Sequence, residues 1–355
     1  MDDTSNSLAQ LTCPAPRPVK DTIVLGHGSG GRLSAELMRS IFLPAFANPV
    51  LSRLDDQATI QVNGARLAFT TDSFVVKPLF FPGGDIGSLA VHGTVNDLAM
   101  GGATPLFLSI AFIIEEGLSI DVLRRVVDSL RAAADKAGVQ IVTGDTKVVE
   151  KGSGDQLFIN TTGIGLVPDQ LELSANRARP GDKVLLSGSI GEHGIAILAQ
   201  REGLEFECPV ESDSAALHEL VAAMLRVNNG NEIRVLRDPT RGGVSSTLNE
   251  IAEQSLVGIQ LEESAIPIRE EVRGACEMLG LDPLYVANEG KLIAIVAPES
   301  AEAMLSAMRS DPLGRNAQII GTVVESASPI VTIRTELGTS RCLDMLTGDQ
   351  LPRIC

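Results

Sequence analysis

Segments with the pattern of strands alternate with segments with the pattern of helices over most of this sequence. Such alternation restricts a chain to folds in which helices pack against sheets. In the first part the pattern predicts helices at 86–100 and 119–137 and strands at 22–25, 58–62, 66–72, 105–114, 139–145 and 157–167. The strand at 105–114 is almost continuously apolar, which favours burial on both faces. The fold class predicted is therefore mixed α/β.

A turn-rich stretch, SANRARPGD, divides the chain into two such units. We expect a mobile Pro-rich leader at 1–20, a first α/β domain at 21–168, a second α/β domain at 169–336 and a flexible tail at 337–355. The last 14 residues, fully extended, would reach about 45 Å at roughly 3.3 Å per residue. A tail of that length is long enough to enter or leave a cleft.

Composition excludes several classes of function. The net charge of -16 and the single Tyr, with no Trp, argue against nucleic-acid binding. No apolar run approaches the roughly 18 residues of a membrane span, and the start MDDTSNSLAQ does not have the pattern of a signal peptide. Five scattered cysteines without a CxxC pair indicate neither a disulfide framework nor a zinc site. We expect a cytoplasmic protein with reduced thiols.

The last residue of the sequence is a cysteine, Cys355, preceded by Pro352, Arg353 and Ile354. A terminal cysteine can occur by chance, since chain ends usually have no role. Prenylation does not account for it, because that motif needs the cysteine four residues from the end. Thiolates form covalent intermediates readily. A flexible arm that carries a reactive sulfur is therefore the functional hypothesis.

A glycine-rich loop, GHGSGG at 26–31, is predicted between a strand and a helix. Its spelling matches G-x-G-x-x-G, and Asp55 and Asp56 follow about 25 residues later, as in dinucleotide sites. A plain turn explains such a match about equally well. In either case Gly28, Gly30 and Gly31 would expose backbone N–H groups at a helix start, which suits phosphate.

Four aspartates lie at the predicted ends of elements or in an apolar helix. Asp72 and Asp145 end strands, Asp56 precedes one, and Asp97 lies in the small, apolar segment VHGTVNDLAMGG. Each one alone reads more simply as a cap or turn residue. Together, with no cluster of Cys or His, they indicate a site for Mg²⁺ between carboxylates and nucleotide phosphates.

Other polar residues have both a structural and a functional interpretation. His92 and Asn96 are four apart on one helix face, where a lone histidine is usually a hydrogen-bonded core residue. Lys147 lies two residues after Asp145 and reads alone as a surface lysine. The string RDPTRGG at 237–243 places two arginines before a helix, as a capped turn or an anion clamp.

Taken together, these strings resemble the HypE family of hydrogenase maturation proteins. The resemblance rests on LGHGSGG, LDDQA, FTTDSFVV, PLFFPGGDIG, HGTVNDLAMGGATP, GDTKVV, RDPTRGG, NEGKL and the terminal PRIC, spread from about residue 23 to 355. NDLAMGGATP, GDTK and RDPTRGG are similar to the wider superfamily of aminoimidazole ribonucleotide (AIR) synthetase, selenophosphate synthetase and thiamine-monophosphate kinase. The Pro-rich leader, with Cys13, departs from the pattern.

The resemblance implies two PurM-like (AIR synthase-like) domains, a homodimer formed through the first of them, and ATP and Mg²⁺ in the cleft between them. It also implies an activity. The carbamoyltransferase HypF loads a carbamoyl group onto the terminal thiol, ATP phosphorylates the carbamoyl oxygen, and loss of phosphate leaves a thiocyanate. The cyanide then passes to iron on a HypC–HypD scaffold.

The resemblance also assigns roles to residues. The expected catalytic residues are Cys355, Glu289 as the base, Lys147 and His92. The expected nucleotide-binding residues are Gly28, Gly30, Gly31, Asp56, Asp72, Asn96, Asp97, Asp145 and Arg241. The expected Mg²⁺ ligands are Asp56, Asp72, Asp97 and Asp145.

Three other functions compete with this one. Selenophosphate synthetase carries its reactive residue in the N-terminal glycine-rich segment, where this chain has His27 and Ser29. A Rossmann oxidoreductase would leave NDLAMGG, GDTK and PRIC without a purpose. A non-catalytic carrier that only presents Cys355 to partners would hydrolyse no ATP.

Overall fold

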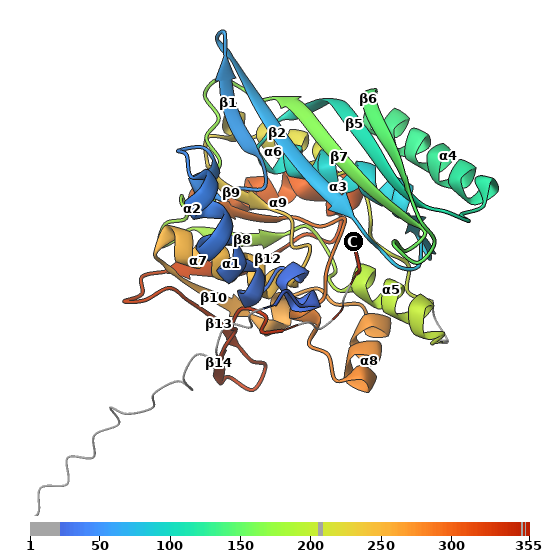
Figure 1. Cartoon of the computed structure of the whole chain (residues 1–355). Helices are drawn as coiled ribbons and strands as arrows, with labels where there is room; N and C mark the ends of the chain where they lie inside the picture. Colours follow the sequence, from blue (N-terminus) through green and yellow to red (C-terminus); the bar gives the residue numbers. More distant parts are fainter. Residues whose placement is uncertain (1–21, 205–208, 349–350, 352) are drawn as a thin grey trace, which may run out of the picture.

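The computed structural model describes residues 22–204, 209–348, 351 and 353–355. The predicted leader at 1–20, with Cys13, lies outside these residues, as do Cys208 and Pro352. The described chain forms two large sheets, each with its own helices and packed one above the other in Figure 1, and a two-stranded ribbon. The predicted mixed α/β class with two units is confirmed.

The first unit is built on a five-stranded sheet in the order β1-β2-β7-β5-β6. Only β5 and β6 run parallel. Helices α3 and α4 cover one face, and the short ribbon β3–β4 lies at one end (Figure 1). The bounds are β1 Ala58–Val62, β2 Ala65–Phe74, β3 Phe80–Phe81, β4 Gly84–Asp85, α3 Ile86–Met100, β5 Thr104–Glu115, α4 Ile120–Ala137, β6 Gln140–Val149 and β7 Leu157–Leu166.

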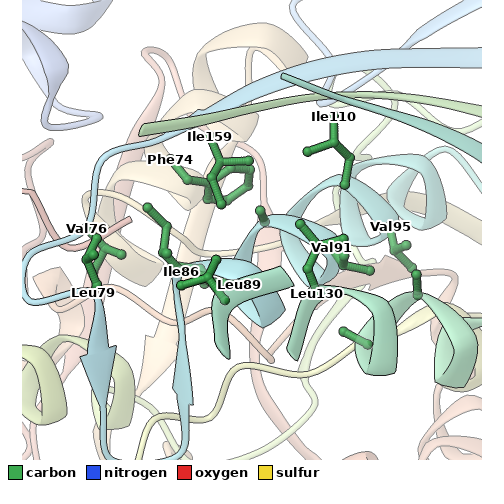
Figure 2. Close-up of a cluster of buried hydrophobic side chains, with 14 of the residues drawn as sticks. Phe74, Val76, Leu79, Ile86, Leu89, Val91, Val95, Ile110, Leu130 and Ile159 are labelled. Carbon is green, nitrogen blue, oxygen red and sulfur yellow. The ribbon is translucent and has the colours of Figure 1, made fainter. Parts of the chain in front are cut away.

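Both helices begin and end where the sequence supplies caps. The Asp85 carboxylate accepts hydrogen bonds from the N–H groups of Gly87 and Ser88 at the start of α3, and Ser119 caps α4. Gly138 ends α4 in the left-handed conformation. Figure 2 shows the core that results, with side chains of both helices packed against those of the sheet. Burial of these apolar side chains supplies most of the stabilisation of this unit.

The second unit is built on a seven-stranded sheet in the order β14-β13-β10-β12-β8-β11-β9, with β10 and β13 parallel. The strands are β8 Lys183–Leu186, β9 Ile233–Arg237, β10 Gly258–Glu262, β11 Ile293–Val296, β12 Gln318–Val324, β13 Ile330–Arg334 and β14 Ser340–Cys342. The helices are α5 Glu192–Glu202, α6 His218–Leu225, α7 Gly243–Ser255, α8 Glu270–Leu279 and α9 Ala301–Arg309. No helix among the described residues is long and apolar enough to cross a membrane.

Helix α3 joins the two units. It is apolar on nearly all sides because the sheet covers one side and the second unit covers the other. On the second side the Asn96 amide donates to the carbonyl oxygens of Ala215 and Glu289, and its oxygen accepts from the N–H of Leu217. A fully bonded buried amide fixes this contact, because leaving its groups unpaired would be costly.

The predicted helices at 86–100 and 119–137 are confirmed, but three strand predictions are wrong. Residues 22–25 form no strand, and the loop begins with a 3-10 turn at Leu25–Gly28. The strand β5 is not buried on both faces, because no helix of the described chain covers its outer side, where Ile113 is 44% exposed. Asp72 and Asp145 lie within β2 and β6 and do not end them. Main-chain pairing with neighbouring strands carries both strands past these polar residues.

The glycine-rich loop leads into one continuous helical segment. It consists of α1 Arg32–Leu37, a π-helical turn η2 Met38–Phe42 and α2 Leu43–Phe46, in agreement with the helix predicted after the loop. In Figure 1 this segment lies beside α7 of the second unit. The remaining short helices are η3 Leu51–Arg53, η4 Asn228–Gly230, η5 Glu263–Ala265, η6 Pro283–Tyr285, η7 Pro298–Ser300 and η8 Pro312–Gly314.

The segment expected to be a flexible tail, 337–355, begins as part of the fold. Residues 340–342 form β14, and the Leu343 side chain is 1% exposed. Main-chain oxygens of the next residues are held by side chains of α7 and by the glycine-rich loop. The hydrogen bonds are Asn249 Nδ2 to Leu343 O (2.8 Å), Ser245 Oγ to Asp344 O (2.7 Å), Arg32 N to Leu346 O (2.9 Å) and Ser29 Oγ to Gly348 O (2.9 Å). The first part of the expected tail, up to residue 348, is therefore bound to the fold.

Candidate functional site

A cavity of about 680 Å³ lies between the two units. Its walls come from α1 and η2, the strand β2, helix α3, the RDPTRGG segment and helix α7. Glu289 and Cys355 also line it. Figure 1 places the C-terminus centrally, between the two sheets. The fold thus brings together residues from the two ends and the middle of the sequence.

Among the acidic residues that line this cavity are the half-buried Asp56, Asp72 and Asp97 and the buried Asp238. Burial raises the pKa of each, to about 6 for Asp238, and the neighbouring carboxylates raise those of Asp56 and Asp97 further. Asp97 Oδ2 accepts a hydrogen bond from Thr70 Oγ1 at 2.7 Å. Asp56 Oδ2 has no hydrogen-bond partner among the described residues. The cluster therefore has negative charge in excess of its local partners.

Two arginines of RDPTRGG oppose this charge differently. Arg237 is committed to the protein, since its guanidinium is 2.6 Å from Asp56 Oδ1 and 2.7 Å from Glu250 Oε2. Arg241 lines the cavity and donates to the Gly28 carbonyl oxygen at 3.1 Å. The charge that Cys355 carries when its thiol ionises, and the negative charge of Asp72, raise the pKa of Arg241. Arg241 is thus the cation placed to meet an anion in the cavity.

The glycine-rich loop fits between Arg241 and the tail. Gly30 has φ +73°, and a Cβ there would lie 2.6 Å from the Arg241 carbonyl oxygen. A Cβ on Gly31 would collide with the Leu346 carbonyl oxygen. Of Gly28, Gly30 and Gly31, only Gly30 lines the cavity. The described residues before the loop form no strand, and the sheet of this unit is mostly antiparallel, so the Rossmann interpretation is wrong. The glycines are required by close backbone packing.

Glu289 is buried in the cavity wall, at 3% exposed, although its sequence suggests an ordinary turn. Burial raises its pKa well above the usual range, and the charges of Asp238 and Asp72 add to this effect. Its Oε1 atom has no hydrogen-bond partner among the described residues. The Asp213 carboxylate fixes the backbone by accepting from the N–H groups of Glu289 and Gly290, at 3.0 and 3.3 Å. A carboxyl group with these properties is a strong proton acceptor once ionised.

The last residues dock along the chain segment that follows β2. Val75 N donates to the Cys355 main-chain oxygen (2.9 Å), and Lys77 N donates to Arg353 O (3.2 Å). Arg353 also forms an ion pair with Asp155. Burial raises the pKa of the Cys355 thiol to about 12, Arg241 opposes the shift, and Glu289 adds to it. In this position the sulfur is a thiol at neutral pH.

His92 does not lie with these groups, although the sequence placed it among the catalytic candidates. Its Nδ1 atom is 2.9 Å from the Ser214 hydroxyl, and it is not among the residues lining the cavity. Burial, followed by the positive charges of Lys136 and His218, lowers its pKa to about 4. Like Asn96, it holds α3 against the second unit, and Asn96 does not line the cavity either.

Asp145 and Lys147 lie on the outer face of the first sheet, away from the cavity of their own chain. Asp145 is in register with Ala111 of β5, Asn160 of β7 and Ser73 of β2. The side chains of this row face away from α3. The Asp145 side chain is 63% exposed and lies 2.5 Å from Lys147 Nζ, whose hydrogen bond lowers the pKa of the carboxyl group. Within one chain, the expected cluster of four aspartates therefore contains Asp56, Asp72 and Asp97 without Asp145.

Two cavity residues were missed by the sequence reasoning. Asp238 lies between the two arginines of RDPTRGG, and Arg237, for which the sequence left a capped turn or an anion clamp open, neutralises Asp56. An acidic residue directly after a strand, flanked by arginines, was the available signal for Asp238. Nothing in the sequence indicated the pairing of Arg237 with Asp56, because 181 residues separate them (237 − 56).

No group of three or more His, Cys, Asp or Glu side chains among the described residues is arranged to hold a metal ion unaided. Mg²⁺ commonly binds one or two carboxylates and completes its shell with water and substrate phosphates. The partnerless Asp56 oxygen and the mutual repulsion of the cluster fit such a shared site. The residues present are therefore compatible with a cation that arrives with a nucleotide.

Two family models match the chain. Residues 54–167 match the N-terminal domain of AIR synthase related proteins, and residues 179–334 match the C-terminal domain. Carbamoyl dehydratase HypE of Cupriavidus necator is 58% identical over 334 residues, covering 94% of this chain and 95% of the relative. The Escherichia coli protein of the same name is 46% identical, covering 94% of this chain and all of the relative.

Solved structures agree with these relatives. A crystal structure of HypE in complex with ATP has a TM-score of 0.79 and 53% identity, covering 94% of this chain and 100% of that one. A HypE–HypF complex has a TM-score of 0.83 and 50% identity, covering 87% of this chain and 99% of the matched one. A thiamine monophosphate kinase from Aquifex aeolicus, at 19% identity and a TM-score of 0.65, shares the fold.

Proposed function

This chain belongs to the HypE family of carbamoyl dehydratases, and we propose that it uses ATP to dehydrate a carbamoyl group carried on Cys355 to a thiocyanate. The cyanide so formed becomes a ligand of the iron in [NiFe]-hydrogenase. The observation that carries the proposal is the placement of Cys355 and the partnerless Glu289 carboxyl in one acidic cavity. ATP turnover that appears only when Cys355 is carbamoylated is the expected result.

The chemistry requires a better leaving group and the removal of protons. Attack of the carbamoyl oxygen on the γ-phosphate of ATP releases ADP and turns that oxygen into a phosphate ester. Loss of this phosphate breaks the C–O bond, while the nitrogen gives up its hydrogens and the C≡N bond forms. We assign the proton transfer to Glu289, whose raised pKa suits a general base. The remaining product is phosphate.

The docked position of Cys355 suits dehydration of the carbamoyl group but not its acceptance from a partner. With the pKa of Cys355 raised from 9.0 to about 12, the docked sulfur is a poor nucleophile at neutral pH. Outside the cavity the thiol would regain an ordinary pKa and could accept a carbamoyl group. We therefore propose that the docked end of the chain, residues 353–355, moves out to meet HypF, the partner present in the relative's HypE–HypF complex, and returns for dehydration.

Mg²⁺ is proposed as the cation that accompanies ATP, held by Asp56, Asp72 and Asp97. When bound, it would neutralise phosphate charge and polarise the transferring group. The aspartates are suited to this role because burial raises the pKa of each, and neighbouring carboxylates raise the pKa values of Asp56 and Asp97 further. A cation relieves that repulsion, so that nucleotide and metal should bind together. Arg241 is assigned to the phosphates.

Replacing Asp97 by alanine should weaken MgATP binding about tenfold or more, equivalent to roughly 1.4 kcal/mol. The reason is the loss of one of the three carboxylates proposed to hold Mg²⁺. Calorimetric titration measures the change. Asp128→Ala removes an exposed aspartate of α4 and serves as the matched control. Wild-type affinity in Asp97→Ala would remove Asp97 from the ligand set.

We also propose a homodimer in which the outer faces of two first-unit sheets meet. Phe69, Ile164 and Phe107 form a partly exposed apolar row on this face, which also carries Asp145 and Lys147. The cavity reaches the same face, since Phe69 is one of its lining residues. A second copy on this face would bring its Asp145 and Lys147 towards the neighbour's cavity. The catalytic role assigned to Lys147 requires this arrangement.

Mixing two inactive variants tests the shared site. In a heterodimer of Lys147→Ala and Glu289→Gln, one site would combine an intact Glu289 with an intact Lys147 from the other subunit. Activity should therefore return after the subunits of the two variants are exchanged. If Lys147 acts within its own chain, the mixture stays as inactive as its components, and an active Lys147→Ala variant would remove Lys147 from the site. Native mass spectrometry, which separates the two homodimers from the heterodimer by mass, reports whether the heterodimer has formed.

The three competing functions are less well supported. The Rossmann oxidoreductase fails on the fold, and selenophosphate synthetase is disfavoured because the similar relatives are carbamoyl dehydratases. A carrier without chemistry does not account for the buried Glu289 beside Cys355. The transfer of cyanide to a HypC–HypD scaffold and the cytoplasmic location stay predictions. Pull-down of HypC–HypD with cyanated protein, and cell fractionation, check them.

A further inference from the structure

His193 is a fully buried polar residue that none of the roles above uses. It lies at the second position of α5 and is 0% exposed, with its ring edge-on to Phe81 at 5.6 Å between centroids. It is not among the residues lining the cavity. Both ring nitrogens nevertheless have close partners. Nε2 is 2.6 Å from the carbonyl oxygen of Ile354, and Nδ1 is 2.7 Å from the hydroxyl of Ser212.

The partners of His193 fix which atom donates in each hydrogen bond of this series. The Ile354 carbonyl can only accept, so Nε2 must carry the proton. In the neutral ring Nδ1 then accepts, and the Ser212 hydroxyl donates to it. That hydroxyl oxygen accepts in turn from the N–H of Ser214 at 3.1 Å. Burial lowers the pKa of His193, which agrees with a neutral ring.

We propose that His193 is the positioning residue that recognises the docked tail, by donating its Nε2 proton to the peptide carbonyl immediately before Cys355. In the cavity, the position of the sulfur depends on that peptide and on the Cys355 main-chain oxygen, which accepts a hydrogen bond from the Val75 N–H. When the tail leaves, the His193 donor loses its partner inside the protein. The histidine therefore stabilises the inward position specifically. This role rests on the proposed function for its biological meaning.

The same segment links tail docking to the proposed base. Ser212 orients His193, and the next residue, Asp213, accepts from the Glu289 N–H at 3.0 Å. The start of α5 is also tied to this region, because Gly191 N donates to Asn288 Oδ1 at 2.7 Å. The carbonyl before Cys355 and the carboxyl of Glu289 are thus held by one connected framework. This framework therefore sets the position of the Cys355 sulfur relative to the Glu289 carboxyl.

Two substitutions distinguish the contribution of the Nε2 contact from that of the Nδ1 contact. In His193→Gln the amide nitrogen can occupy the place of Nε2 and donate to Ile354. In His193→Asn the shorter side chain can reach Ser212 but not the tail. The measurement is the alkylation rate of Cys355 by iodoacetamide in the uncharged full chain. Cys342 is exposed on β14 and provides an internal reference in the same molecule.

His193→Asn should increase the Cys355 to Cys342 rate ratio about ten- to a hundredfold, the scale expected when a buried carbonyl loses its donor. His193→Gln should stay within about threefold of wild type. Equal ratios in His193→Asn and wild type would overturn the proposal. So would a His193→Gln ratio as high as that of His193→Asn, because the ring would then act only by filling space.

Folding is checked in the same digest through Cys276, which is buried and should stay unreactive. If Cys276 of His193→Asn reacts, Ser212→Ala replaces it in the test. That variant leaves the ring unoriented and should also raise the ratio, whereas an unchanged ratio would overturn the proposal. A second readout is single-turnover dehydration, which should slow in His193→Asn at unchanged ATP affinity. The alkylation result does not depend on carbamoyl chemistry, so a wild type that fails to dehydrate would contradict only the proposed function.

Discussion

Replacing Cys355 by alanine should abolish acceptance of the carbamoyl group and, with it, all dehydration. The substitution removes the sulfur that forms the covalent link. It should leave the fold and MgATP binding intact, because the residues before it are held by their main-chain atoms and by the Arg353 side chain. Peptide mass spectrometry after incubation with HypF, carbamoyl donor and ATP measures acceptance. Calorimetry measures the nucleotide affinity.

The other described cysteines serve as controls. Cys342 lies exposed on β14 and Cys276 is buried, with its pKa raised to about 11 by burial. Cys342→Ala and Cys276→Ala should accept and dehydrate at wild-type rates, as should variants of Cys13 and Cys208. A carbamoyl adduct on any cysteine other than Cys355 would contradict the assignment of the carrier.

Replacing Glu289 by glutamine should lower the dehydration rate about a hundred- to ten-thousandfold, the usual effect of losing a general base. Glutamine keeps the size of the side chain but cannot take the proton from nitrogen. The protein should still accept a carbamoyl group on Cys355 and then stall. Single-turnover conversion of the carbamoylated protein measures this step. Glu253→Gln is the control, since Glu253 lines the same cavity but pairs with Arg39 at the surface. Conversion within a few-fold of wild type would reduce Glu289 to a structural residue.

The raised pKa of Glu289 also predicts the pH dependence of rate and stability. A base must be ionised to act, so dehydration should become faster as pH rises through that pKa. The folded protein holds this proton to a higher pH than the unfolded chain, whose ordinary value is near 4.5. Stability is therefore lost as pH rises from about 4.5 through the folded-state pKa. Glu289→Gln should raise the melting temperature at neutral pH and flatten this dependence.

Elements whose ends are marked by capping residues were predicted correctly from the sequence. The helices at 86–100 and 119–137 have caps at Asp85 and Ser119, and their patterns match their environments. The strands β2 and β6 were predicted too short, because Asp72 and Asp145 resemble terminators when read alone. The inward row of β2 in fact includes Asp72 next to α3, where Gly93 leaves room for it.

The site was only partly predictable, because it is made by contacts between distant segments. The string NEGK gives no sign of burial in the sequence, and only the packing of α3 and Asp213 against it shows that Glu289 is buried. Nothing near His193 in the sequence pointed to the tail, since 161 residues separate it from Ile354. His92 and Asn96 carried the right spacing for one helix face, but the spacing did not reveal that this face binds the second unit.

Intact mass spectrometry of the wild-type chain, first with HypF and a carbamoyl donor and then with MgATP, tests the central claim most directly. The account predicts one added carbamoyl group in the first step and the loss of one water from that adduct in the second. Both changes should map to Cys355, and Glu289→Gln should stop after the first. An adduct that keeps its full mass after MgATP is consumed by the wild type, or that maps elsewhere, would contradict the account.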